Sequence, residues 1–410
     1  MIRVLHTADW HIGQTMRGYS REFEHRAVFG RLVEIVAERE VDALIVAGDV
    51  FDGQNPSGES HQLFYETLVR LHRARPKMTI VIVAGNHDAA GRLEAPRALL
   101  RSFNVHVVGN IRRRDGVIEA DRHLIPLPDP TGNAAAHVMA VSYPTAACLP
   151  ALVRLDGEGE SPVVRAVRSL YSQLRDTLAP RFSGLPLIAT GHLHVMGGIE
   201  SEGAERRILI GGQHAVSPEI FPEEFDYVAL GHLHKAQRVG RDTIRYSGSL
   251  IPLSATELSY RHGVTLVTMD GTSVTSEHIL LERPVPFLRL AGAEDVRLSE
   301  VGDHLEAMAL PPDLPFELRP FLQIRLAREG ITSGFREEVD RLAEAFPVRI
   351  VDVRVAAVAD IATNDEAPDE LVRLTERDPE DLFRMAFAKE FGQAPDAAHL
   401  DVFHRVRSEA

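Results

Sequence analysis

Short apolar runs alternate with amphipathic segments over the first 270 residues of the chain. Four of these runs end in a glycine-containing turn, which is typical of buried strands. They are VDALIVAGD (41–49), MTIVIVAGNHD (78–88), LPLIATGH (185–192) and DYVALGH (226–232). Residues 22–40 and 161–178 carry apolar side chains at helical spacing. Buried strands that alternate with helices predict a layered α/β domain, with the ligand site formed by polar residues just past the strand ends.

The pattern changes after residue 280, where a second and smaller domain is predicted. Residues 283–358 alternate strand-like and helical segments in the order β-α-β-α-β, which indicates a compact α+β unit. We therefore expect a first domain over residues 1–275 and a small capping domain over residues 283–358. Residues 359–370 (ADIATNDEAPDE) are acidic and lack apolar periodicity, so they are predicted to be a linker.

Residues 371–410 are predicted to form a pair of short helices. The first covers 377–392, where Asp378 stands at the N-cap position and Pro379 at the first helical position, as helix starts favour. The second restarts over 395–406. Their apolar faces are too small for an independent core, so the two helices either fold back on the main body or form a docking surface for a partner.

Composition narrows the class of protein. The chain has 410 residues and 44% apolar content, enough for more than one buried core. A single cysteine, Cys148, excludes a framework of intramolecular disulfides. No charged and apolar leader precedes the first strand-like run, and no apolar run approaches the roughly 18–20 residues that span a bilayer. We therefore expect a cytoplasmic protein that does not enter a membrane.

The formal net charge of −14 argues against a broadly basic face for nucleic acid. The acidic excess is uneven, because residues 271–410 hold 16 Lys and Arg against 28 Asp and Glu. The remainder of the chain is nearly neutral, so charge permits a nucleic-acid substrate without indicating one.

Metal-ligand side chains follow five of the predicted strands or turns. They are Asp9 and His11 in ADWH, Asp49 and Asp52 in GDVFD, Asn86, His87 and Asp88 in GNHD, His192 in a first GHLH, and His232 and His234 in a second GHLH. Two divalent ions about 3.5–4 Å apart can activate water and neutralise charge during phosphodiester hydrolysis. A carboxylate can bridge such a pair, and Asp49 is the natural candidate. Mixed Asp, His and Asn ligands favour Mn²⁺, with Mg²⁺, Fe²⁺ or Zn²⁺ as alternatives.

The order of these motifs resembles that of the calcineurin-like metallophosphoesterases, whose fold is a two-layered β-sandwich flanked by helices. A closer similarity, to the double-strand-break repair nucleases of this superfamily, lies in HTADWHIGQTMRGYSREFEH, IVAGDVFDGQNPS, YVALGHLHKAQRVG and IRYSGSLIPLS. It covers nearly the whole chain, including the capping domain and the helical pair. Members of that family act on DNA ends together with an ATPase subunit.

The resemblance implies a role for each motif residue. One cation would be held by Asp9, His11, Asp49 and His234, and the second by Asp49, Asn86, His192 and His232. His87 would contact the scissile phosphate and protonate the leaving oxygen or stabilise the transition state. Asp52 is the preferred carboxylate for orienting His87, and Asp88 is the alternative. His194 has no implied role, so we expect it at the surface or behind the ligands.

The resemblance also implies a substrate and partners. The activities would be a 3′–5′ exonuclease on duplex ends and an endonuclease on single strands and hairpins, in DNA repair, recombination and replication. The ATPase would bind residues 371–410, and the protein would associate with the nucleoid when on DNA. Candidate phosphate contacts are Arg17, Arg21, Arg26 and Lys235, with plain solvation of these side chains as the alternative.

A homodimer through helices of the nuclease domain is implied as well. The amphipathic segments 57–74 and 92–103 stand where that helix bundle should fall, although their apolar residues can equally pack on their own sheet. Two other functions remain open. One is a phosphodiesterase for small molecules, since the fold alone does not choose a substrate. The other is a scaffold subunit without metals, which the complete set of ligand-type residues disfavours.

Overall fold

The computed structural model describes residues 1–356 except 130, 146, 150–160, 183, 202–214, 272, 332 and 333, together with the single positions 383, 395, 399 and 400. Residues 1–356 form one compact unit, which does not include residues 357–410. The predicted linker and, apart from those four positions, the predicted helical pair lie outside the described residues. Among the helices of the described part, none combines the length and apolar character needed to cross a bilayer.

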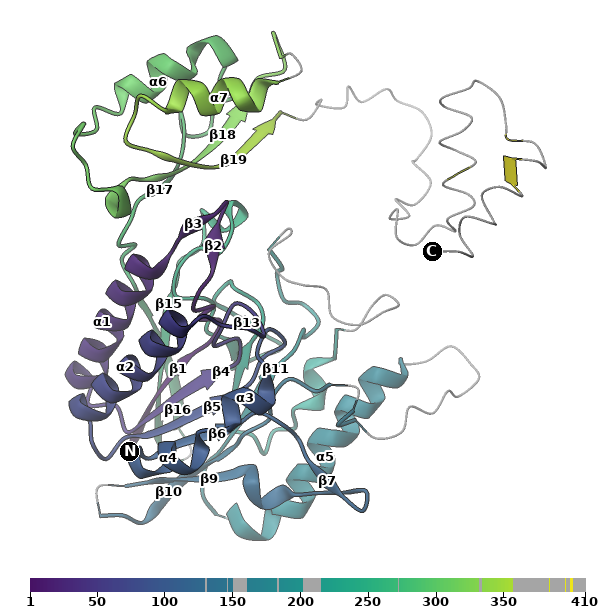
Figure 1. Cartoon of the computed structure of the whole chain (residues 1–410). Coiled ribbons are helices and arrows are strands. Elements are labelled where there is room, and N and C mark those ends of the chain that lie inside the picture. The colour runs from purple at the N-terminus through teal and green to yellow at the C-terminus, as the bar shows by residue number, and fades with distance from the viewer. Residues whose placement is uncertain are drawn as a thin grey trace. The chain divides into compact units, whose positions relative to one another are not determined.

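Two six-stranded sheets form the core of the larger unit (Figure 1). The first, in spatial order, contains β16 (Ser273–Leu280), β15 (Gly263–Asp270), β1 (Ile2–Thr7), β4 (Ala43–Ala47), β5 (Thr79–Val83) and β6 (Val105–Val108). The second contains β13 (Gln237–Val239), β14 (Arg241–Tyr246), β12 (Tyr227–Gly231), β11 (Leu187–His192), β10 (Ala134–Met139) and β9 (Leu124–Pro128). All four strands predicted from the apolar runs are present.

Parallel pairing sets the direction of the central strands. In the first sheet β1, β4, β5 and β6 are parallel neighbours, and in the second β10, β11, β12 and β14 are. One apolar cluster draws on both sheets, including Val4, Ile45 and Val81 from the first and Val138 and Ile188 from the second. The two sheets therefore pack face to face, which confirms the predicted β-sandwich.

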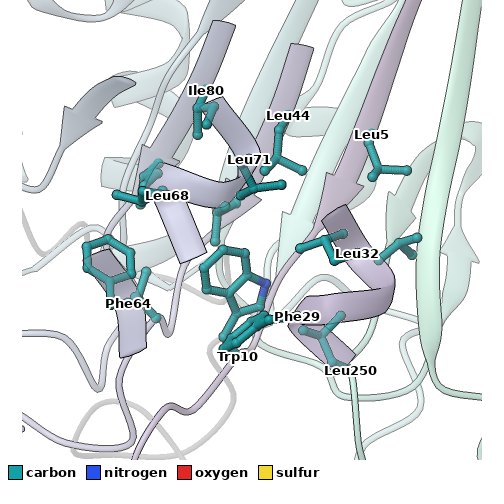
Figure 2. Close-up of a cluster of buried hydrophobic side chains, with 14 of the residues drawn as sticks. Leu5, Trp10, Phe29, Leu32, Leu44, Phe64, Leu68, Leu71, Ile80 and Leu250 are labelled. Carbon is teal, nitrogen blue, oxygen red and sulfur yellow. The ribbon is translucent and has the colours of Figure 1, made fainter. Parts of the chain in front are cut away.

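Helices cover the outer face of each sheet. On the first lie α1 (Glu22–Glu38) and α2 (Gly58–Ala74), and on the second lies α5 (Pro162–Phe182). Figure 2 shows Trp10, from the turn after β1, packed on Phe29 of α1, with ring centroids 4.8 Å apart, and Phe64 of α2 nearby. The apolar spacing of these helices produces the stripe that faces the sheet. A fully buried Trp10 thus anchors the turn that carries Asp9 and His11.

The structure clarifies the two amphipathic segments 92–103 and 57–74. The segment 92–103 is not one amphipathic helix: it forms α3 (Ala90–Glu94), α4 (Arg97–Leu100) and a 3₁₀ turn, because Pro96 cannot donate a backbone hydrogen bond and begins a new helix. On α2, the apolar residues Leu63, Phe64, Leu68 and Leu71 pack in the core of their own domain.

Residues 287–355 have the predicted β-α-β-α-β order. The elements are β17 (Phe287–Arg289), α6 (Val301–Ala307), β18 (Phe321–Leu326), α7 (Phe335–Ala343) and β19 (Arg349–Val355). The three strands form a parallel sheet with an apolar cluster of its own, which includes Leu305, Ile324 and Val339. A smaller cluster joins Met16 of the hairpin β2 (Thr15–Met16) and β3 (Tyr19–Ser20) to Phe321. This region therefore packs on the hairpin that follows the first motif.

Candidate metal centre

The predicted ligands meet at one edge of the sandwich. Asp9 and His11 follow β1, Asp49 follows β4, Asn86 follows β5, His192 ends β11, and His232 and His234 follow β12. Because the carboxyl ends of parallel strands lie at the same edge of a sheet, residues far apart in sequence converge there. The two GHLH segments contribute to this single site.

Asp49 occupies the centre of the cluster. Its Oδ2 lies 3.1 Å from Nε2 of His192 and 3.6 Å from Nε2 of His11. The same Nε2 of His192 lies 3.0 Å from Oδ1 of Asn86. Ligand atoms of Asp9, His11 and His234 fall within 4.8 Å of one another, and so do those of Asp9, Asp49 and His192. One carboxylate oxygen thus faces two sets of nitrogen and oxygen ligands.

The donor atoms fit divalent cations. Asp9 Oδ2 and His11 Nε2 are buried and have no hydrogen-bond partner among the described residues, an arrangement that costs free energy unless something else pairs with them. Nδ1 of His11 contacts Oδ1 of Asp52 (3.1 Å), and Nδ1 of His192 contacts the Ala47 carbonyl (2.8 Å). Each ring therefore has Nδ1 engaged and directs Nε2 at the other members of the cluster, where a metal would bind.

The backbone at the site is strained. Asp9, His11, Asp49 and His232 have φ angles of 52°, 45°, 49° and 103°, in the left-handed region that side chains other than glycine rarely occupy. Such conformations cost on the order of 1–3 kcal/mol each and persist where the surrounding structure enforces them. The positions of these four residues are therefore held by the fold.

Glycines in the motifs permit the close approach of the two sheets. A Cβ on Gly48, which has a φ of 93°, would lie 2.2 Å from Nδ1 of His192. A Cβ on Gly231 would lie 1.9 Å from the Ala47 carbonyl oxygen. Any larger residue at either position would push His192 away from β4, so the glycine in each motif serves the ligand of another strand.

His87 lies beside the cluster. Its backbone N–H donates to Oδ1 of Asp49 (2.8 Å), its Nδ1 donates to the main-chain carbonyl of Asp52 (2.8 Å), and its ring centroid is 4.8 Å from that of His11. Atoms of His11, Asp52 and His87 also lie within 4.8 Å of one another. A main-chain contact from Asp52 therefore fixes His87, while the Asp52 carboxylate contacts His11.

The alternative orienting residue, Asp88, has another task. Its carboxylate accepts from the backbone N–H groups of Gly85, Val50 and Phe51, at 2.8, 3.1 and 3.0 Å. Burial, together with the nearby Asp49 charge, raises the pKa of Asp88 to about 6. These contacts tie the GNHD turn to the GDVFD turn, which is a structural role.

The four predicted phosphate contacts differ in how exposed their side chains are. Arg21 is 1% exposed, is paired with Glu24 and donates to the Pro252 carbonyl, so the structure corrects its prediction as a DNA contact. Its guanidinium lies 5.0 Å from the ring of Phe321 and joins the hairpin to the small sheet. The other three remain exposed or half-exposed: Arg17 pairs with Asp340, Arg26 with Glu22 and Glu66, and Lys235 lies over the Tyr260 ring.

Two further residues complete the surroundings. His194 is half-buried and lies 3.2 Å from Glu200, as expected for a residue without a ligand role. Glu257 was not predicted: its carboxylate lies 2.8 Å from Nδ1 of His234. No local motif marks Glu257, since only the return of a later loop brings it to the site.

Cation binding is expected to release a proton. Burial disfavours a charge on His192, but the nearby Asp49 carboxylate overcomes this effect and raises the pKa of His192 to about 9. At about pH 7.5 the metal-free ring is therefore protonated, and a cation that takes Nε2 must displace that proton. We expect Mn²⁺ binding near pH 7.5 to release at least one proton per chain, and the number released to decline as the pH rises above about 9. Calorimetric titration in two buffers of different ionisation enthalpy measures this number, and a binding heat independent of the buffer would contradict it.

A β-sandwich whose parallel strands bring Asp, His and Asn side chains into one buried cluster defines a class, the metal-dependent phosphoesterases of the calcineurin-like kind. Residues 2–236 match the family model described as Calcineurin-like phosphoesterase. Residues 283–391 match the SbcD_C model, described as Type 5 capsule protein repressor C-terminal domain.

Three curated relatives are named as the SbcD component of the nuclease SbcCD. The protein from Rhodobacter capsulatus is 46% identical over 387 residues, which cover 94% of this chain and 94% of that protein. The protein from Bacillus subtilis is 32% identical over 99% of this chain and 98% of its own length, and that from Escherichia coli K12 is 32% identical over 86% and 85%. The chain belongs to the SbcD family of calcineurin-like phosphoesterases, which confirms the resemblance found in its motifs.

Proposed function

We propose that this chain is a DNA nuclease subunit that uses two divalent cations, preferably Mn²⁺, and works with an SbcC-type ATPase. The class of reaction, metal-dependent hydrolysis of phosphodiesters, follows from the family and the ligand cluster. The two-cation assignment rests on the Asp49 carboxylate. Its Oδ2 lies 3.1 Å from Nε2 of His192 and 3.6 Å from Nε2 of His11, which belong to the two different sets of proposed ligands. Its relatives are named as nucleases and as components of SbcCD.

In this proposal the ligands divide into two sets that share Asp49. Asp9, His11 and His234 hold one cation, and Asn86, His192 and His232 hold the other. When bound, the pair lowers the pKa of a water molecule and neutralises the phosphoryl oxygens.

His87 has a separate role at the leaving group. The Asp52 carbonyl can only accept a hydrogen bond, so it keeps a proton on Nδ1 of His87. Nε2 is then the atom that serves the substrate. In its charged form the ring can donate the Nε2 proton to the leaving 3′ oxygen.

The proposed substrates are duplex ends, degraded in the 3′–5′ direction, and single strands and hairpins, cut internally. The proposed attachment of the ATPase is residues 371–410, and the proposed location is the cytoplasm and, on DNA, the nucleoid. Support for the extra segments is the match of residues 283–391 to a model named for the SbcD C-terminal region. The division into domains 1–275 and 283–358 and the linker at 359–370 belong to the same proposal.

The proposed homodimer would use α2 and the segment 92–103, together with the outer face of α1, which packs beside α2. The residues first considered on α2 are in the core, so the contact would rest on the exposed apolar side chains Phe23, Tyr65 and Val69. An apolar group on adjacent helices is the kind of surface that a second copy can cover.

Cleavage of an end-labelled linear duplex in Mn²⁺ tests the proposal, with and without the SbcC-type partner and ATP. We expect degradation from the ends that is abolished by chelation and restored by Mn²⁺. A small phosphodiester such as bis(p-nitrophenyl) phosphate is the comparison substrate. Fast hydrolysis of that compound without any cleavage of DNA would replace the proposal by a small-molecule phosphodiesterase.

A further inference from the structure

A buried carboxylate lies behind one of the proposed metal ligands. Glu257 is fully buried, at the end of the 3₁₀ turn Ala255–Glu257. Its Oε1 lies 2.8 Å from Nδ1 of His234, and its Oε2 accepts the backbone N–H of Leu253 at 2.8 Å. Both carboxylate oxygens are thus engaged, one of them by the histidine.

The contact determines which nitrogen of His234 carries the proton. An ionised carboxylate only accepts hydrogen bonds, so Nδ1 must donate and Nε2 presents its lone pair. The His234 ring centroid lies 5.3 Å from that of His11, and its ligand atom falls in the group with Asp9 and His11.

A loop is built around this pair. The backbone N–H of Ser249 donates to the carbonyl of His234 (3.1 Å). His262 contacts Oγ of Ser249 through Nδ1 (3.1 Å), and the Ser254 side chain accepts from the N–H of Thr256 at the start of the 3₁₀ turn. Burying a charged group is costly unless its partners are held in place, and these contacts hold Glu257 against His234.

The histidine ligands differ in what lies behind them. Nδ1 of His192 contacts a neutral main-chain carbonyl, whereas Nδ1 of His234 contacts a carboxylate. A carboxylate makes the imidazole a more basic ligand and adds negative charge near the cation. This effect should strengthen binding of the cation that His234 would hold with Asp9 and His11.

We propose that Glu257 is a positioning residue that fixes the tautomer of His234 and strengthens binding of the cation held by Asp9, His11 and His234. It touches neither substrate nor cation. The inference rests on the proposed function, because it takes His234 to be a metal ligand.

The variant Glu257→Gln tests the inference with little change in size. If the amide oxygen accepts from His234, the amide NH₂ faces the Leu253 N–H, and two donors meet. If the oxygen accepts from Leu253, the NH₂ faces Nδ1 and moves the histidine proton to Nε2, where the cation would bind. Either arrangement should weaken one of two Mn²⁺ sites by roughly 10- to 100-fold, measured by calorimetry and by electron paramagnetic resonance of free Mn²⁺.

Glu94→Gln is the matched control. Glu94 is also a buried carboxylate, but it accepts from the N–H of Gly109 and pairs with Arg112 and Arg122. This variant should lower thermal stability in chelator and keep the Mn²⁺ affinities of the wild type. Equal weakening of Mn²⁺ binding in both variants would show a general effect on folding and overturn the proposal.

The other outcomes separate this inference from the proposed function. Two Mn²⁺ ions of unchanged affinity in Glu257→Gln overturn the inference alone, whereas a wild type that binds no Mn²⁺ overturns both. If Glu257→Gln does not fold, ¹⁵N-histidine spectra of the Zn²⁺-loaded wild type decide, with His234 assigned by difference from His234→Gln. A proton on Nδ1 of His234 supports the inference, and a proton on Nε2 overturns it.

Discussion

Replacing His87 by glutamine is expected to slow DNA cleavage by about 10²- to 10⁴-fold while both cations remain bound. We assign the His87 side chain to contact with the substrate. Its Nδ1 donates to the Asp52 carbonyl, and its backbone N–H donates to Asp49. Glutamine keeps the backbone contact with Asp49 and a similar size. It cannot carry the proton that the leaving oxygen needs, so the loss should fall on the chemical step.

Single-turnover cleavage with enzyme in excess measures that step, and elemental analysis of the desalted protein measures the bound metal. His194→Gln is the matched control, because His194 lies in the same GHLH segment as the proposed ligand His192 but pairs with Glu200. It should cleave at the wild-type rate. Loss of one cation from His87→Gln, in proportion to the loss of rate, would make His87 a ligand and contradict its assignment to the leaving group.

Most of the cluster could be predicted from the sequence because its geometry follows from topology. Parallel strands deliver the residue after each carboxyl end to a common edge, so Asp49 after β4 and His192 at the end of β11 meet although 143 positions separate them in the numbering. The prediction needs only the strands, which the apolar runs show, and the residue types that follow them.

Contacts that depend on packing between distant segments could not be predicted. Arg21 is enclosed by Phe321 and Glu24, and nothing near Arg21 in the sequence indicates either its burial or that aromatic partner. Glu257 is similar, since its pairing with His234 depends on the path of a loop. The break at Pro96 is the opposite case, because the proline is visible in the sequence and its effect is local.

Amphipathic periodicity likewise identifies an apolar face without identifying what covers it. The face of α2 that contains Phe64 and Leu68 packs on the sheet. Tyr65 and Val69, one position further along in each case, remain exposed. The two sets differ by about 100° around the helix, which the sequence shows, but only the structure assigns one to the core and leaves the other exposed.

The second large effect is expected for Asp49→Asn, which should lose tight binding of both cations and reduce cleavage by roughly 10³-fold or more. A bound pair contributes several kcal/mol to stabilising the transition state, and about 1.4 kcal/mol corresponds to each tenfold change in rate. The amide oxygen of asparagine can still take the place of Asp49 Oδ1 and accept the His87 backbone N–H. Asparagine cannot supply the negative charge that both sets of ligands share, and an amide NH₂ in place of Oδ2 would point at His192 and His11.

Asp88→Asn separates this loss from damage to the fold. Asp88 is a neighbouring buried carboxylate, but its oxygens accept three backbone N–H groups, from Gly85, Val50 and Phe51. An amide there would set NH₂ against a backbone donor, so Asp88→Asn should lower the unfolding temperature in chelator yet still bind two Mn²⁺ ions. Asp49→Asn should keep its secondary structure and unfold cooperatively, but Mn²⁺ should not raise its unfolding temperature. If Asp49→Asn retained two tight ions, the shared ligand would have to be another residue, and Asp9, whose ligand atoms join both groups, would be the one to replace next.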